Sequence, residues 1–435
     1  MNFIQRALSA GVAGAAVLAL LSGCGGGSND SSASVRLVNA TSQYSSLDLY
    51  SSGTLLTSDT ASYSVGSYYG VGAGSYTFNL VGPDSTATAA SASVAVTSGS
   101  HYAIVGYVSG GSLQTATLTE DQAAPTAGTA QIRIFNAAYS NVGTVDTYLT
   151  TNACSALPSS ADAAISSSLA STSAFISVTA ATSGTNYHLC VTAAGDKTDL
   201  RLDVPSVTLT SQQVTTLILT NTTGGVLLNG VLLNQQSTLT QALNTSARMR
   251  LAVGASASAA VSATVNNVSL GSSLTAPAVG NYQLVTAGAL TTNITVGGTA
   301  VSTSGLSVAA GADVTLLVNG TAASTPVLIA DDNSVSTSTT YPVKLRLVNG
   351  LNGTTTAATM TDDYVTIGNG ATSGSATAYS QVAASSAASR IEADYGATQL
   401  CLSTGVTLTS GHVYSVFLLG DLPTASTTCT IRVDR

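Results

Sequence analysis

A short apolar segment with an arginine near its start returns four times along the chain, at intervals of about a hundred residues. The four copies are Val35-Arg36-Leu37-Val38-Asn39-Ala40, Ile132-Arg133-Ile134-Phe135-Asn136-Ala137, Met249-Arg250-Leu251-Ala252-Val253-Gly254 and Leu345-Arg346-Leu347-Val348-Asn349-Gly350. This period is the length of a small all-β domain, so the segment predicts four similar modules that each begin with the same strand.

The composition favours folded β-structure over disorder or membrane-spanning helices. Hydrophobic residues make up 44% of the chain, whereas disordered chains combine low hydrophobicity with high net charge. After residue 24 no run approaches the ~18 apolar residues of a spanning helix. Val, Thr and Leu alternate with Gly, Ser or Asn turns at about ten-residue spacing, which is typical of β-sandwiches. We therefore predict an all-β fold of tandem immunoglobulin-like or transthyretin-like β-sandwich modules.

Three further landmarks follow the opening strand of each module. In the first module they are a second strand at 47–50, a Gly-led aromatic strand at 74–78, and a hairpin in which 93–99 runs into 101–105. In the last module the second strand is predicted at 363–366. The aromatic strand is predicted at 186–189, 280–284 and 398–402 in the other three modules.

These landmarks, and the polar stretches between them, divide the chain into six segments. The segments are a lipoprotein signal peptide at 1–23, a flexible tether at 24–34, and β-sandwich modules at 35–121, 131–236, 248–332 and 343–435. The links between the modules are short, which predicts a semi-rigid rod and not beads on long strings.

The first 24 residues resemble the signal of a bacterial lipoprotein. Arg6 supplies a positive start and an apolar run follows to Leu20. Leu21-Ser22-Gly23-Cys24 is similar to a lipobox, in which the cysteine is acylated, for example by palmitate. An ordinary secretory signal with an incidental cysteine is the alternative. The next residue is Gly25 and not Asp, so the resemblance implies sorting to the outer membrane.

Four cysteines remain after Cys24, and in an oxidising compartment they allow three disulfide pairings. We prefer Cys154–Cys190 and Cys401–Cys429 because each bridge then stays inside one module. Buried free thiols are the alternative. No two cysteines have the close spacing of zinc sites, so we predict no metal site. No motif predicts a cofactor.

Several of these features together resemble a bacterial family of domains of unknown function, numbered 4397. They are the opening 35–40, the strand 47–50, the turn and strand 73–77, and the closing Asp331-Asp332-Asn333. The resemblance is closer over 35–235 than over 249–435, where the third module lacks the Asn-Ala end of the opening strand. It implies envelope or secreted proteins, often with tandem copies, and implies no activity.

The sequence offers little chemistry for catalysis. The histidines are His101, His188 and His412, and aligning Tyr102 with Tyr414 shows that the first and last do not coincide. No Gly-x-Ser-x-Gly string joins a strand to a helix. We therefore predict no catalytic residue and no enzyme.

The charged residues of the repeats are predicted to be structural. The opening Arg should face outward and pair with a carboxylate on a neighbouring strand, such as Asp48 or Asp146. The Asn after it should satisfy a turn. A ligand contact is the alternative role for the arginine. We interpret Asp331-Asp332-Asn333 as a solvated linker, with calcium binding as the alternative.

Tyrosine is concentrated in the first module, which holds eight of the 17 in the chain. Aromatic rings with a polar tip suit the recognition of sugars or proteins. Tyr63, Tyr68 and Tyr69 are the candidates for a ligand patch on the surface, although strand propensity explains other tyrosines of this module.

Together these features predict a non-catalytic cell-envelope lipoprotein that acts as a structural or binding scaffold. The alternatives are a surface adhesin or glycan-binding protein, and a hydrolase of envelope glycans. The expected partners are the membrane, through the lipid on Cys24, and an envelope protein or polysaccharide. Nucleic acid is not expected, because 20 acidic residues outnumber 12 basic ones. The chain is predicted to be a monomer.

Overall fold

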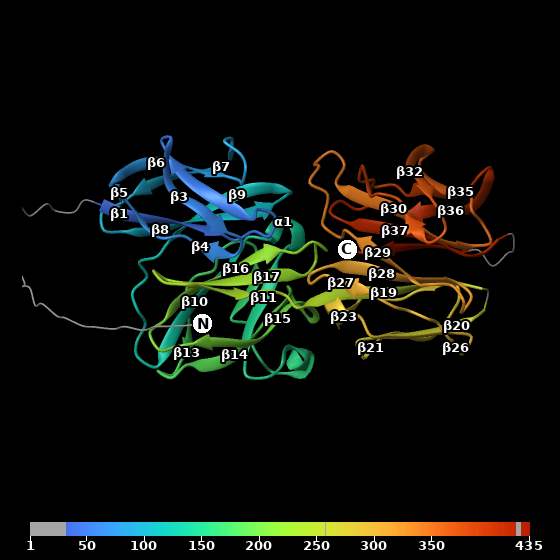
Figure 1. The fold of residues 1–435 in the computed structure, drawn as a ribbon, viewed down its shortest axis with the longest axis horizontal. Helices are drawn as coiled ribbons and strands as arrows, with labels where there is room; N and C mark the ends of the chain where they lie inside the picture. The colour runs from blue at the N-terminus through green and yellow to red at the C-terminus, as the bar shows by residue number, and fades with distance from the viewer. Residues whose placement is uncertain (1–31, 257, 423–427) are drawn as a thin grey trace, which may run out of the picture.

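The computed structural model describes residues 32–256, 258–422 and 428–435, whose strands form four β-sandwich modules (Figure 1). Each module has a first sheet, which contains the opening strand, and a second sheet that packs on it. The predicted all-β sandwich fold is therefore confirmed. No helix among the described residues is long and apolar enough to cross a bilayer.

Modules 1 and 2 share the same two-sheet plan. In module 1 the first sheet consists of β1 (Ser32–Asn39), β4 (Ser64–Val65), β5 (Tyr69–Gly72), β8 (His101–Ser109) and β9 (Ser112–Thr119), and the second of β2 (Ser46–Ser51), β3 (Thr54–Ala61), β6 (Gly74–Val81) and β7 (Thr88–Val96). In module 2 the first sheet consists of β10 (Thr129–Asn136), β13 (Ile176–Thr179), β16 (Val214–Asn221), β17 (Leu228–Asn234) and β18 (Leu239–Ala242), and the second of β11 (Val145–Thr150), β12 (Ser166–Leu169), β14 (Thr185–Ala193) and β15 (Asp196–Leu209). Module 2 also contains the short helices α1 (Tyr139–Val142) and η1 (Cys154–Ser159).

Modules 3 and 4 repeat this plan. In module 3 the first sheet consists of β19 (Ser246–Ala255), β22 (Ala278–Val279), β23 (Gln283–Thr286), β28 (Asp313–Gly320) and β29 (Val327–Asp331). The second sheet consists of β20 (Ala260–Val265), β21 (Val268–Thr275), β25 (Thr292–Val296) and β26 (Thr299–Ala300). The short strands β24 (Gly288–Ala289) and β27 (Ser307–Val308) pair with each other. In module 4 the first sheet consists of β30 (Val343–Asn352), β33 (Ser375–Ala376), β34 (Ser380–Val382), β37 (Val413–Asp421) and β38 (Thr428–Val433), and the second of β31 (Ala358–Asp362), β32 (Val365–Ala371), β35 (Ser389–Tyr395) and β36 (Thr398–Val406).

At the centre of every first sheet, the opening strand pairs in parallel with a strand from near the end of its module. In modules 1, 2 and 4 the strand just before that partner, such as β7, belongs to the second sheet. The hairpin predicted over 93–105 is therefore wrong, and its turn carries the chain from one sheet to the other. Two alternating strands joined by a short turn look the same in sequence whether they pair with each other or not.

The aromatic strands predicted at 280–284 and 398–402 are wrong in position. β23 pairs with the opening strand and so corresponds to β5, whereas β36 is an edge strand of the second sheet and so corresponds to β7. In module 1 a Gly-Ser-Tyr sequence ends at Tyr68 just before β5, and another, ending at Tyr76, opens β6, so the pattern does not distinguish these two strands.

The second strand predicted at 363–366 in module 4 is also misplaced. Asp363 and Tyr364 form the turn between β31 and β32, with φ of 45° and 69°. At the other end of the chain, the predicted tether reaches residue 34, but β1 already begins at Ser32. The predicted signal peptide and Cys24 lie outside the described residues.

The opening strands are buried on both faces, as is typical of strands covered on both sides. Val35 and Leu37 point into the sandwich core and pack with Leu47 and Phe78 of the second sheet. Val38 lies on the opposite face, in a separate apolar cluster that contains residues of modules 1 and 2. The outer face of each first sheet therefore contacts a neighbouring module.

This contact joins the modules in pairs. Modules 1 and 2 meet through Val38, Val105, Phe135, Ile218 and Val231 and their neighbours. Modules 3 and 4 meet through an equivalent cluster that includes Leu317, Val348 and Phe417. Figure 1 shows the two resulting lobes side by side, each built of two stacked modules. The predicted rod is therefore wrong, because the apolar outer faces of the first sheets are covered by a second module.

Candidate functional site

The opening arginines lie at the interfaces between paired modules and not on an open surface. Arg36 is only 3% exposed, and its Nε donates to Glu120 Oε2 at 2.7 Å. Its Nη atoms donate to the backbone carbonyls of Ser237 and Asn234 in module 2, at 2.5 and 3.2 Å. In return, Arg133 of module 2 donates to the carbonyl of Thr119 in module 1 at 2.9 Å. Each guanidinium therefore links its own first sheet to the neighbouring module.

In the second lobe the arginines exchange carboxylates across the interface. Arg250 of module 3 forms an ion pair with Asp434 of module 4, with Nη2 3.0 Å from Oδ2. Arg346 of module 4 forms an ion pair with Asp331 of module 3. The side chains of both aspartates are fully buried. This arrangement is reciprocal, like an isologous interface between two copies of one subunit.

An aromatic ring lies against each opening arginine. The guanidinium carbon is 4.5–4.7 Å from the ring centroid in all four modules, a distance at which cation–π attraction operates. The rings are Tyr68, Phe175, Tyr282 and Tyr379, and each immediately precedes the short strand that pairs with the opening strand. Sequence reasoning missed this set, although an aromatic residue before a short strand in every module was the signal that could have revealed it.

The predicted carboxylate partners of the opening arginine are wrong. Asp48 accepts a hydrogen bond from the backbone of Asp59 at 2.7 Å, and Asp146 accepts from the backbones of Ser168 and Gly195 at 2.7 and 2.9 Å. Both aspartates lie on the second sheet, whereas the arginine points away from it. The predicted role of the following Asn is confirmed, since Asn39 Oδ1 accepts from the backbone of Thr41 at 3.2 Å.

The buried tyrosine rings predict a loss of stability at alkaline pH. Burial raises the pKa of the Tyr282 hydroxyl well above its ordinary value, and it also raises the pKa of Tyr379. Below about pH 10 the folded and unfolded states both keep these protons, so the free energy of unfolding does not depend on the titration of these tyrosines. Above it, the unfolded state loses protons that the folded state retains, and the free energy of unfolding should fall. Urea denaturation across this pH range measures the slope.

The Tyr379→Phe variant should show a shallower fall than the wild type. Tyr364→Phe is the control, because the Tyr364 side chain is 77% exposed. An equal change of slope in both variants would contradict the assignment of the effect to the buried rings.

The predicted tyrosine patch does not form one surface. Tyr63 is 8% exposed and lies in the interface between modules 1 and 2, where its hydroxyl accepts a hydrogen bond from Asn229 at 2.9 Å. Tyr68 donates to Glu120 at 2.6 Å beneath Arg36. Only Tyr69, at 41% exposure, presents a large part of its side chain to solvent. Two of the three candidates therefore help to hold the lobe together.

The closing acidic segment of module 3 is engaged by cationic side chains of the protein. Asp331 lies between Arg250 and Arg346, and Asp332 pairs with Lys344 at 2.6 Å. The interpretation of a solvated linker is therefore wrong for Asp331, whose side chain is fully buried. The guanidinium groups of Arg250 and Arg346 balance the negative charge of Asp331, which a calcium ion would balance in the alternative interpretation.

The three histidines have different surroundings. His101 Nδ1 lies 2.8 Å from Asp121 Oδ1, and its ring meets Tyr68 edge-on. His412 Nδ1 lies 3.1 Å from the carbonyl of Ser410. The register places His101 opposite Ser34 but Val413 opposite Lys344, in agreement with the sequence alignment of the two turns.

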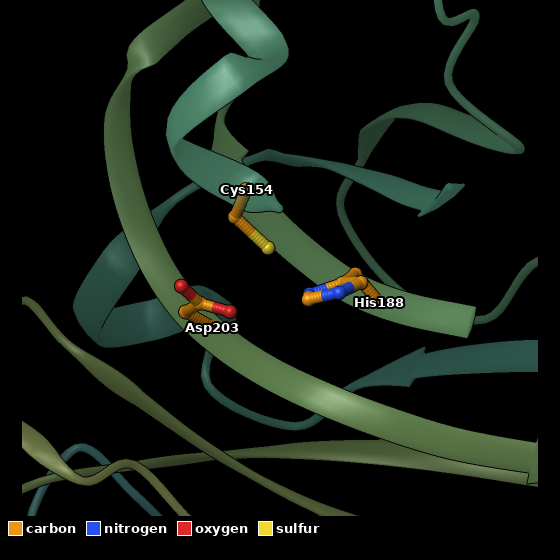
Figure 2. Close-up of side chains that lie close together, drawn as sticks. All are labelled: Cys154, His188 and Asp203. Carbon is orange, nitrogen blue, oxygen red and sulfur yellow. The ribbon is translucent and has the colours of Figure 1, made fainter. Parts of the chain in front are cut away.

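His188 belongs to a compact cluster in module 2 (Figure 2). A nitrogen of its ring, Cys154 Sγ and a carboxylate oxygen of Asp203 lie within 4.8 Å of one another. Burial raises the pKa of the Asp203 carboxyl, and the nearby His188 opposes this shift. The sequence predicts no metal site, because no two cysteines have the close spacing of zinc ligands, yet these three are the described residues best placed to hold an ion.

The disulfides in the structure join Cys154 to Cys190 and Cys401 to Cys429. These are the two pairings preferred from the sequence. The first bridge ties η1 to the outer face of the second sheet of module 2, where Leu157 and Tyr148 pack around it. Cys154 therefore has no free thiolate while this bridge is intact.

Residues 33–148 match the model of the family described as "Domain of unknown function (DUF4397)". The resemblance inferred from the opening strand is thus confirmed for module 1 and the start of module 2. No curated protein matches the chain.

Among solved structures, one similar chain is CBMbc, a family CBM26 module from Eubacterium rectale Amy13K solved in complex with maltoheptaose. It is 10% identical, with a TM-score of 0.15, and the match covers 48% of this chain and 96% of that chain. Another is the Bacillus anthracis TIE protein, 9% identical with a TM-score of 0.14, for which the match covers 90% of this chain and 68% of that chain. At these TM-scores neither likeness bears on function.

Proposed function

We propose that the chain is a non-catalytic scaffold of the cell envelope, held at the outer membrane by a lipid on Cys24. The observation that carries this proposal is that the repeated arginines are buried in contacts between modules and are not exposed to a ligand. Arg36, Arg250 and Arg346 are each 2–3% exposed and bind carboxylates or carbonyls at module interfaces. The recurrent ionisable groups therefore stabilise the assembly, and loops outside the interfaces are left to contact an envelope protein or polysaccharide.

A Cys24→Ala protein should leave the membrane fraction of fractionated cells. Each buried methylene of an acyl chain contributes about 0.8 kcal/mol to membrane binding, and the variant lacks every acyl chain. Immunoblotting of the fractions measures the distribution, and Ser28→Ala in the predicted tether is the matched control. Retention of the Cys24→Ala protein at the membrane would contradict the anchor.

The released protein also allows the absence of catalysis to be tested. Incubation with envelope glycans should release no reducing ends above the buffer level. Release that disappears in a His101→Ala variant would overturn the non-catalytic assignment, because His101 with Asp121 is the exposed acid–base pair of module 1.

A further inference from the structure

Neighbouring strands place potential metal ligands on one face of module 2. His188 and Cys190 are two residues apart on β14, so their side chains point to the same side of the sheet. Asp203 on β15 lies directly opposite Cys190 in the antiparallel register. Cys154 begins η1, which covers this face, and Figure 2 shows its sulfur directed toward His188 and Asp203. Three elements thus bring sulfur, nitrogen and oxygen ligands together.

Two of these ligand residues each have a buried side-chain atom without a hydrogen-bond partner among the described residues. His188 Nδ1 and Asp203 Oδ1 are buried atoms without a hydrogen bond to any described residue. A buried polar group left unpaired costs about 1–3 kcal/mol, so it calls for a reason beyond packing. Both atoms belong to residues of the cluster, in which a His188 nitrogen, Cys154 Sγ and an Asp203 carboxylate oxygen lie within 4.8 Å of one another. An ion held between them would satisfy both.

The disulfide controls the third ligand. In the oxidised protein Cys154 is bonded to Cys190, and a disulfide sulfur is a poor metal ligand because thiolate is the coordinating form of cysteine. A reductant gives two thiols in the same place. Cys154 is then a ligand beside His188 and Asp203, and Cys190, its former disulfide partner, supplies a second thiol. Two sulfurs, an imidazole and a carboxylate form a set that suits tetrahedral Zn²⁺.

We propose that reduction of the Cys154–Cys190 disulfide opens a binding site for Zn²⁺ or a similar borderline divalent ion, formed by Cys154, His188, Asp203 and Cys190. A dithiol or phosphine reductant supplies the two electrons. With a phosphine, one water molecule and the disulfide yield the phosphine oxide and two thiols. Each thiol loses its proton when its sulfur binds the ion. This site is independent of the scaffold role.

The test uses the mature full-length chain carrying Cys24→Ser, with Co²⁺ as a spectroscopic probe. Before phosphine treatment the protein should bind no Co²⁺ in a thiolate environment. After treatment it should bind one ion per chain, with the sulfur-to-cobalt charge-transfer bands and intense ligand-field bands of tetrahedral coordination. Zn²⁺ should displace the probe and abolish the bands.

Matched variants assign the ligands. His188→Gln and Asp203→Asn keep the disulfide, and each should weaken binding to the reduced protein by at least about tenfold. Cys401→Ser with Cys429→Ser removes the other pair of thiols and should leave binding unchanged. The equivalent double substitution at Cys154 and Cys190 should abolish it.

Three results would overturn the proposal. One is equal binding before and after reduction. Another is binding by the reduced protein that both His188→Gln and Asp203→Asn leave intact, since the thiols alone would then hold the ion. The third is a reduced protein that loses its β-sheet circular dichroism and does not regain it when Co²⁺ is added.

Discussion

An Asp331→Ala protein is expected to lose about 3–5 kcal/mol of unfolding free energy, the usual cost of removing one partner from a buried ion pair. The Asp331 carboxylate pairs with Arg346, lies 3.7 Å from Arg250, and accepts hydrogen bonds from Thr315 at 2.7 Å and Tyr282 at 2.5 Å. Its removal leaves the Arg346 guanidinium, whose side chain is 2% exposed, without its carboxylate partner. Urea denaturation of the full chain measures the loss.

Asp332→Ala is the matched control, because it makes the same change one residue further on. The Asp332 side chain is 54% exposed, and its partner Lys344 also donates to the carbonyls of Asp332 and Ser334 at 2.9 Å. The Lys344 side chain is only 7% exposed but keeps these carbonyl partners, so the loss should approach the ~0–1 kcal/mol of an exposed pair. Equal losses in the two variants would contradict the importance given to the buried exchange of carboxylates.

A Gly254→Val substitution should weaken the pairing of modules 3 and 4. A Cβ atom on Gly254 would lie 2.2 Å from the carbonyl oxygen of Gly350, which is backbone and has no side-chain freedom to move away. The two opening strands approach each other here, and Asn352 of module 4 donates to the Gly254 carbonyl. Overpacking of this kind costs about 1–3 kcal/mol. Urea denaturation should show the loss, and limited proteolysis should show easier cleavage of the second lobe.

Gly405→Val tests whether the effect belongs to the interface. Gly405 lies in β36 with no atom within 4 Å of an added Cβ and no positive φ. Valine suits a strand, so this variant should keep or slightly raise the stability. A loss as large as that of Gly254→Val would show that any branched residue in a module 4 strand is harmful.

The close approach at Gly254 also explains a departure within the repeat. The opening segments of modules 1 and 2 end in Asn-Ala, whereas those of modules 3 and 4 end in glycine, at Gly254 and Gly350. In the sequence this difference looks like a weaker match to the opening segment of module 1. In the structure the absence of a Cβ at Gly254 allows its backbone to lie against that of Gly350.

The number of modules and their sandwich class could be predicted because both depend on local signals, namely a recurrent strand and alternating apolar residues. The opening strand also contains a signal for the pairing of modules. Alternation assigns Val38 to the outer face, and an apolar residue there indicates that the face is covered. The arginine on the same face, however, suggested that the face is exposed to solvent. The face holds both because Arg36 reaches carbonyls of module 2 while Val38 packs beside it.

The ligand cluster of module 2 could not be found from spacing. Cys154, His188 and Asp203 come from three elements, and only the register of β14 with β15 and the cover of η1 bring them together. The carboxylate partners of the arginines were missed for the same reason. Asp434 lies 184 residues from Arg250, and no local pattern connects them.

That separation affects the order in which the modules pair during synthesis, which proceeds from the N-terminus. Glu120 follows Arg36 by 84 residues, so the first lobe gains its carboxylate early. Arg250 gains its carboxylate partner only with Asp434, 184 residues later in the chain. Domains fold as units during synthesis, N-terminal first, and partly assembled forms are prone to aggregation. The ion pair of Arg250 therefore forms only after synthesis has reached Asp434 in module 4, so the interface of the second lobe is completed later than that of the first.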